Sequence, residues 1–80
     1  MSVDTNKPLV VTSANNTTAL MTVETTGQAS ISGDTFQIST SKTPASSGAA
    51  GQAGQIAWDG GYIYVCIGPN LWMRAQLQSF

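Results

Sequence analysis

A chain of 80 residues can form one small domain at most, and such a domain buries only about 60% of the surface that its unfolded chain exposes. Charged residues make up 9% of the sequence and the net charge is −1, so there is no basic surface for nucleic acid. One cysteine and no histidine exclude an internal disulfide, a zinc site of the usual kind and catalysis by an imidazole. No apolar run approaches the roughly 18 residues of a membrane span. We therefore expect no nucleic acid, membrane, metal or cofactor as a partner.

The first part of the chain predicts a polar arm followed by short strands. Residues Met1–Lys7 lack the basic and apolar regions of a secretory signal peptide, which predicts a loose arm and synthesis in the cytoplasm without standard export. Leu9–Val11 is a short apolar run after Pro8 and predicts the first strand. Ser13–Thr18 predicts a turn, and the threonine-rich stretch Ala19–Thr25 favours a strand over a helix.

A β-hairpin is predicted around the dipeptide Gly33-Asp34. Its strands would be Gln28–Ser32 and Thr35–Thr40, because apolar and polar residues alternate on both sides of a tight turn. The apolar positions would form one face of this hairpin: Ile31, Phe36 and Ile38. Asp34 stands beside glycine, as Asp59 does further along, and there a short carboxylate accepts backbone N–H bonds.

The segment Lys42–Gly54 contains almost only small or polar side chains. This composition is typical of a flexible linker, which is the interpretation we favour. The alternative is an ordered, extended segment in which small residues allow close approach of backbones, as where three chains converge near an axis. The sequence does not decide between the two.

The segment Gln55–Leu77 predicts three short strands and holds both tryptophans, both tyrosines and the cysteine. No sustained helical periodicity occurs anywhere, so we predict an all-β protein of small antiparallel hairpin and meander units. The predicted strands and turns are, in order, Gln55–Trp58, Asp59–Gly61, Tyr62–Ile67, Gly68–Asn70 and Leu71–Leu77.

Alternation places aliphatic side chains on one face of this predicted sheet and aromatic side chains on the other. Cys66, in mid-strand, is expected to be a small buried residue. A three-stranded sheet of this length gains about as much from burial as it loses in chain entropy, so we expect other copies of the chain to cover it. The predicted interface is Ile56, Trp58, Tyr62, Ile63, Tyr64, Val65, Ile67, Trp72, Met73 and Leu77. Alternatively, Trp58, Tyr62 and Trp72 form a glycan-binding platform.

The segment resembles a C-terminal module of tailed-bacteriophage structural proteins. The residues that carry the resemblance are Gly54–Asp59, Tyr62–Cys66, Asn70, Trp72 and Arg74, preceded by the small-residue stretch Thr43–Ser47. The layout is also similar to the trimerising β-hairpin of phage fibritin, and this resemblance implies a homotrimer about a threefold axis. Met73 departs from the pattern, since the phage modules usually carry lysine there, and this favours a buried Met73.

We therefore expect a phage virion protein that is made in the host cytoplasm. Its parts would be an arm with virion-attaching strands at residues 1–41, a small-residue linker at 42–54 and a trimerisation module at 55–80. With no imidazole and only scattered carboxylates, no enzymatic activity is expected. The favoured function is capsid decoration as a trimeric cement protein bound to the major capsid protein or another virion protein. The alternative is a short tail or fibre-tip protein that binds host-surface glycans.

Overall fold

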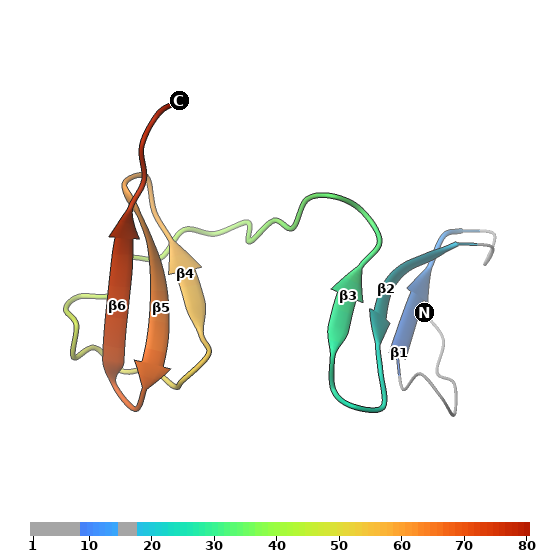
Figure 1. The fold of residues 1–80 in the computed structure, drawn as a ribbon, viewed down its shortest axis with the longest axis horizontal. Helices are drawn as coiled ribbons and strands as arrows, with labels where there is room; N and C mark the ends of the chain where they lie inside the picture. Colours follow the sequence, from blue (N-terminus) through green and yellow to red (C-terminus); the bar gives the residue numbers. More distant parts are fainter. Residues whose placement is uncertain (1–8, 15–17) are drawn as a thin grey trace. The chain divides into compact units, whose positions relative to one another are not determined.

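The computed structural model describes residues 9–14 and 18–80, which fold as two units, Met1–Gln37 and Ile38–Phe80. Each unit holds one three-stranded antiparallel sheet, with the strand order β1-β2-β3 in the first and β4-β5-β6 in the second (Figure 1). The described residues contain no helix, so the prediction of an all-β protein is confirmed. Within them there is accordingly no helix long and apolar enough to cross a membrane.

The N-terminal sheet is a meander of β1 (Leu9–Thr12), β2 (Ala19–Val23) and β3 (Ala29–Ile31). At the first turn Ser13 and Thr18 are bonded across the ends of β1 and β2, with Ser13 N–H donating to the Thr18 carbonyl at 2.8 Å. At the second turn Gly27 has a φ of 87°, a conformation that favours glycine. The strands predicted at Leu9–Val11 and Ala19–Thr25 are confirmed. The predicted arm and residues 15–17 of the first turn lie outside the described residues.

The hairpin predicted around Gly33-Asp34 is wrong. β3 pairs with the preceding strand β2, and the Ser32 N–H extends this pairing by donating to the Leu20 carbonyl at 3.0 Å. Residues 35–40 form no strand, and Phe36 is 70% exposed instead of packing on a hairpin face. The alternation around Gly33-Asp34 fits a hairpin locally, but β3 is only three residues long and all three are exposed, so a further strand would bury little apolar surface against it.

The C-terminal sheet consists of β4 (Ile56–Trp58), β5 (Tyr62–Gly68) and β6 (Leu71–Gln76). Its strands and turns agree with those predicted from the sequence. The β5–β6 register shifts between Cys66 and Gly68, just before a tight turn in which Asn70 has a φ of 53°. Asparagine is one of the few residues other than glycine that adopts this backbone conformation at little cost.

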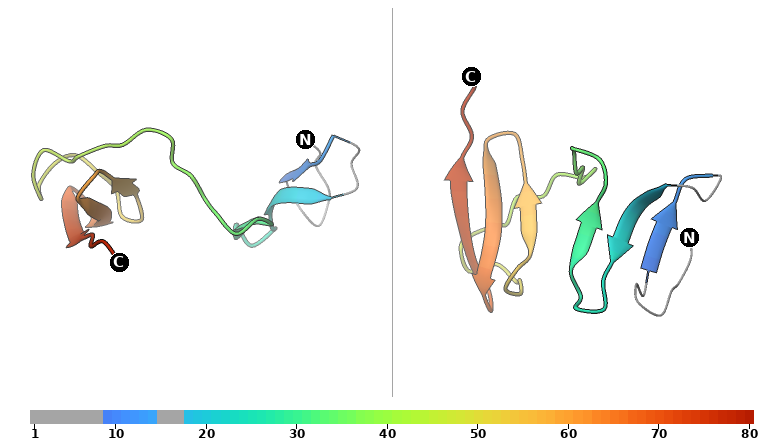
Figure 2. Two further views of the ribbon diagram at one scale, coloured as in Figure 1. Left: turned by 90° about the horizontal axis from the view of Figure 1, so that it is seen from above. Right: turned by 45° about the vertical axis from the view of Figure 1, so that its right-hand side comes forward.

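The segment Lys42–Gly54, which we call the strap, is ordered and lies on one side of this sheet (Figures 1 and 2). Its backbone is bonded to the sheet at several points: the Trp72 N–H donates to the Ser47 carbonyl at 2.8 Å, and the Gly54 N–H donates to the Cys66 carbonyl at 2.7 Å. Of the two interpretations of this segment, the structure therefore agrees with an ordered, extended one.

The strap makes the two faces of the C-terminal sheet unequal. The face of the sheet beneath the strap carries the buried core, which consists of Ala57, Tyr64, Cys66 and Trp72. Cys66 is fully buried and its thiol donates to the Gly68 carbonyl at 3.0 Å, as expected of a small buried residue. The opposite face, which we call the outer face, carries aliphatic side chains that remain exposed.

Candidate functional site

Asp59 is the polar centre of the strap side. Its carboxylate accepts four hydrogen bonds: from the Thr43 hydroxyl at 2.6 Å, from the Tyr64 hydroxyl at 2.5 Å, and from the backbone N–H groups of Gly61 and Tyr62 at 2.9 and 3.0 Å. These bonds, the one from Thr43 foremost, hold the pKa of Asp59 well below its usual range. The same Asp59 carboxylate raises the pKa of the Tyr64 phenol. The turn role predicted for Asp59 is confirmed, and the bond to Thr43 adds a connection between turn and strap.

Asn70 anchors the middle of the strap. Its side-chain oxygen accepts the Gly51 N–H at 3.1 Å, and its own N–H donates to the Gly51 carbonyl at 3.0 Å. Close by, the Trp72 indole N–H donates to the Ala50 carbonyl at 3.3 Å. The Trp72 ring is thus fixed by the backbone of the strap that covers it.

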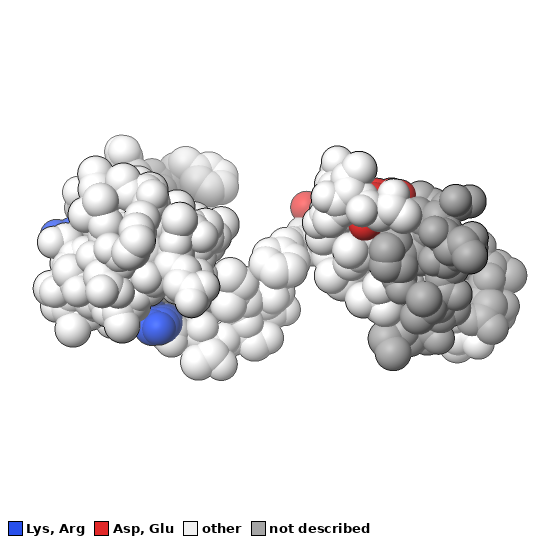
Figure 3. All heavy atoms as spheres, turned by 90° about the horizontal axis from the view of Figure 1, so that it is seen from below, with Lys and Arg blue, Asp and Glu red and all other residues white. Residues whose placement is uncertain are grey.

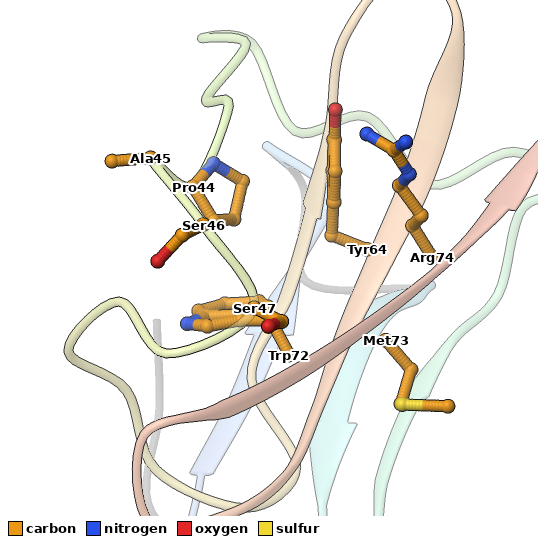
Figure 4. Close-up of a pocket in the computed structure, with 8 residues that line it drawn as sticks. All are labelled: Pro44, Ala45, Ser46, Ser47, Tyr64, Trp72, Met73 and Arg74. Carbon is orange, nitrogen blue, oxygen red and sulfur yellow. The ribbon is translucent and has the colours of Figure 1, made fainter.

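A pocket of about 320 Å³ lies between the strap and the sheet (Figure 4). Arg74 and Tyr64 point into it side by side, and the Trp72 ring lies beneath the strap residues. The Arg74 guanidinium also lies over the Tyr62 ring, 4.1 Å from its centroid, which is a cation–π arrangement. The residues that line the pocket are Pro44, Ala45, Ser46, Ser47, Tyr64, Trp72, Met73 and Arg74.

The outer face is a continuous apolar surface. On β5 the exposed residues Ile63, Val65 and Ile67 alternate with the more buried tyrosines and Cys66, and Met73 is directly opposite Val65 on β6. The visible surface of this unit is largely uncharged (Figure 3). Exposed apolar surfaces of this kind mark interaction sites in soluble proteins. The exposed large apolar residues of the three strands are Ile56, Trp58, Ile63, Val65, Ile67, Leu71 and Met73, and Leu77 follows β6.

The structure divides the predicted interface into aliphatic residues on the outer face, which are exposed, and aromatic residues that make contacts within their own chain. Tyr64 and Trp72 are 4% and 5% exposed and are covered by the strap of their own chain, and Tyr62 lies beneath Arg74. Trp58 is 37% exposed, and its indole N–H donates to the Ile38 carbonyl at 2.7 Å. The glycan platform predicted from Trp58, Tyr62 and Trp72 therefore has one member buried and two held by contacts within the chain.

Two features of the site were not predicted from the sequence. One is the bond from Thr43 to Asp59, which joins residues 16 positions apart. The other is the pocket, which depends on docking of the strap over β6. One feature of the sequence favours docking of the strap: its residues are mostly small, which permits close approach to an aromatic ring. Among the described residues, no three His, Cys, Asp or Glu side chains are grouped so as to hold a metal.

Comparison with known proteins finds a bacteriophage relative. The chain is 44% identical over 48 residues, or 60% of its length, to "Depolymerase 1, capsule K30/K69-specific" of Klebsiella phage K5-2. The matched part is 6% of that protein's length. Because 48 residues is more than either unit contains, a continuous match of that length extends into both units. No family model matches the chain, and no solved structure matches it.

This relative supports the resemblance to bacteriophage proteins and corrects one expectation. The expectation of a protein without enzymatic activity is wrong, since the relative is named as a depolymerase, which is an enzyme. The expectation relied on the lack of an imidazole and on scattered carboxylates within 80 residues. The 48 matched residues are 6% of the depolymerase, so most of that enzyme lies outside the match.

Proposed function

We propose that this chain is part of a bacteriophage tail fibre or tail spike that engages polysaccharide on the host surface. The observation that carries this proposal is the similarity to a capsule-specific phage depolymerase. It favours the tail or fibre interpretation over capsid decoration, for which the comparisons give no support.

We further propose that the C-terminal unit joins three copies of the chain through its outer face. The support for this is the row of exposed aliphatic residues on β5, which a single chain leaves in contact with water. Each such side chain that a second copy buries contributes roughly 1.5–3 kcal/mol. Closed symmetric assembly covers the same face on every copy at once. The resemblance to the fibritin hairpin implies three copies.

The N-terminal unit would then connect the assembly to the rest of the virion. Its described sheet has only one buried residue, Thr22, whereas the core cluster of apolar residues belongs to the C-terminal unit. A sheet with so little buried apolar surface gains stability when it packs against a partner.

Immunogold labelling of intact virions with an antibody against this chain tests the proposed location. Gold confined to the tail or its tip is the expected result. Gold distributed over the shell would contradict the proposal and return capsid decoration to first place. A virion lacking its tail provides the control, since it should lose the label.

A further inference from the structure

We propose that the pocket between the strap and the sheet, which the edge of Trp72 lines, binds one acidic sugar residue of a polysaccharide through Arg74. This inference rests on the proposed function, because it supplies the carbohydrate chemistry that a polysaccharide-engaging tail protein needs. It moves the candidate glycan contact from the platform of Trp58, Tyr62 and Trp72 to a pocket whose walls come from two segments of the chain.

The size of the pocket suits a single sugar ring. Its volume of about 320 Å³ is at the lower end of the range of small-molecule sites, which is about 300–1,000 Å³. On the strap side the Pro44 ring faces Tyr64, whereas the Ala45 and Ser46 side chains point away from the sheet and do not close the pocket. A ring at the end of a chain, or a branch, can therefore enter while the rest of the polysaccharide remains in solvent.

The floor and wall of the pocket are aromatic and rigid. The Trp72 ring is fixed by its bond to the Ala50 carbonyl, and the Tyr64 hydroxyl is fixed by its bond to Asp59. Because Tyr64 and Trp72 are only 4% and 5% exposed, a sugar ring would touch their edges, and their part is to keep the pocket in a fixed shape.

The charge of the pocket selects an acidic ligand. Arg74 makes no ion pair with a carboxylate of the described residues, and its guanidinium is positioned by the Tyr62 ring at 4.1 Å. The carboxylate of Asp59, on the other side of the Tyr64 hydroxyl, already accepts four hydrogen bonds from the chain. A guanidinium presents two parallel N–H donors to a carboxylate, so a uronate fits this cation better than a neutral hexose.

The test uses NMR of the isotopically labelled full chain, titrated with methyl β-D-glucuronide and with the neutral methyl β-D-glucoside. The two tryptophans give two indole N–H signals, one from the pocket (Trp72) and one from outside it (Trp58). Trp58→Phe assigns them by removing one. We expect the Trp72 signal to shift progressively with the glucuronide and the Trp58 signal to stay in place. The glucoside should bind about tenfold or more weakly, since it lacks the charged hydrogen bonds.

Two variants and a matched control complete the experiment. Arg74→Gln should abolish the response to the glucuronide, whereas Lys42→Gln removes a cation outside the pocket lining and should preserve it. Pro44→Ala removes the strap ring that faces Tyr64 and should also weaken binding, which covers the case in which Arg74→Gln fails to fold.

Absence of a Trp72 shift at millimolar glucuronide, or equal binding of both glycosides, would overturn the proposal. It would also be overturned if the parent chain shows no glycoside response and Arg74→Gln only disrupts the oligomer. None of these results depends on where the antibody labels the virion, so the two proposals fail separately.

Discussion

Gly51 lies directly against the indole ring of Trp72. A Cβ atom built at residue 51 would be 2.7 Å from the Trp72 indole nitrogen and 2.9 Å from the Cys66 sulfur, closer than real Cβ atoms approach other atoms. The strap can therefore cover the core only because residue 51 has no side chain. At residue 51, close packing against Trp72 explains why the strap carries a glycine.

Gly51→Ala should destabilise the C-terminal unit by about 1–3 kcal/mol, because the added methyl group must displace the strap or the buried Trp72. Urea unfolding followed by tryptophan fluorescence measures this, since both tryptophans belong to that unit. Gly48→Ala is the matched control: its Cβ would meet only the Ser46 hydroxyl, at 3.9 Å. Equal stability of the two variants would show that the strap is not held against Trp72.

Asn70 should tolerate glycine better than alanine. Both substitutions remove the bond from the Gly51 N–H to the Asn70 side chain, but only alanine must also adopt a φ near 53° with a Cβ atom. The left-handed conformation costs such a residue about 1–2 kcal/mol, so Asn70→Ala should be less stable than Asn70→Gly by about 1 kcal/mol. The difference between their urea midpoints measures it. The reverse order would show that the turn does not impose this conformation on residue 70.

The strands of the C-terminal sheet could be predicted because their signals are local. In β5 the aliphatic residues Ile63 and Val65 alternate with Tyr64 and Cys66, and glycine-containing turns bound the strand. The faces predicted from this alternation are those that the structure shows. Such a pattern depends on neighbours in the sequence and not on distant contacts.

The docking of the strap could not be predicted, because it depends on contacts between distant residues. The bond from the Trp72 N–H to the Ser47 carbonyl involves only backbone atoms, which every sequence has. The same limit explains the wrong hairpin at Gly33-Asp34: local alternation predicts a strand at residues 35–40, but it does not show whether that segment finds a partner, and β3 pairs with β2 alone. The pocket could not be predicted for the same reason, since the strap forms one of its walls.

The bonds of the Asp59 carboxylate predict a loss of stability in acid. Its pKa is lowered in the folded chain, chiefly by the Thr43 hydroxyl, and returns to its ordinary value on unfolding. The unfolded state therefore binds the proton more readily, and this contribution to stability is complete above the ordinary pKa of about 3.9 and is lost progressively below it. Unfolding measured between pH 2 and 6 should show this decline, and Asp59→Asn should flatten it.

Asp34→Asn is the control for this pH dependence. The Asp34 carboxylate accepts a bond from the neighbouring Thr35 hydroxyl at 2.8 Å, and it belongs to the other unit. The tryptophan signal of this variant should therefore keep the acid dependence of the parent chain. An acid slope that survives in Asp59→Asn would assign the effect to another carboxylate.

Val65→Asp should disperse the proposed trimer. Val65 lies at the centre of β5 on the outer face, is 36% exposed in the single chain and is directly opposite Met73 on β6 and Ile56 on β4. A carboxylate there can remain hydrated in a monomer, but it would be buried without a partner between copies, which is strongly unfavourable.

Light scattering should give three times the chain mass for the parent and a lower mass for the variant. Gln76→Asp adds the same charge to an exposed position of β6 on the strap side and should leave the mass unchanged. A monomeric parent at micromolar concentration would remove the trimer, whereas an intact trimer in Val65→Asp would place its interface away from the outer face.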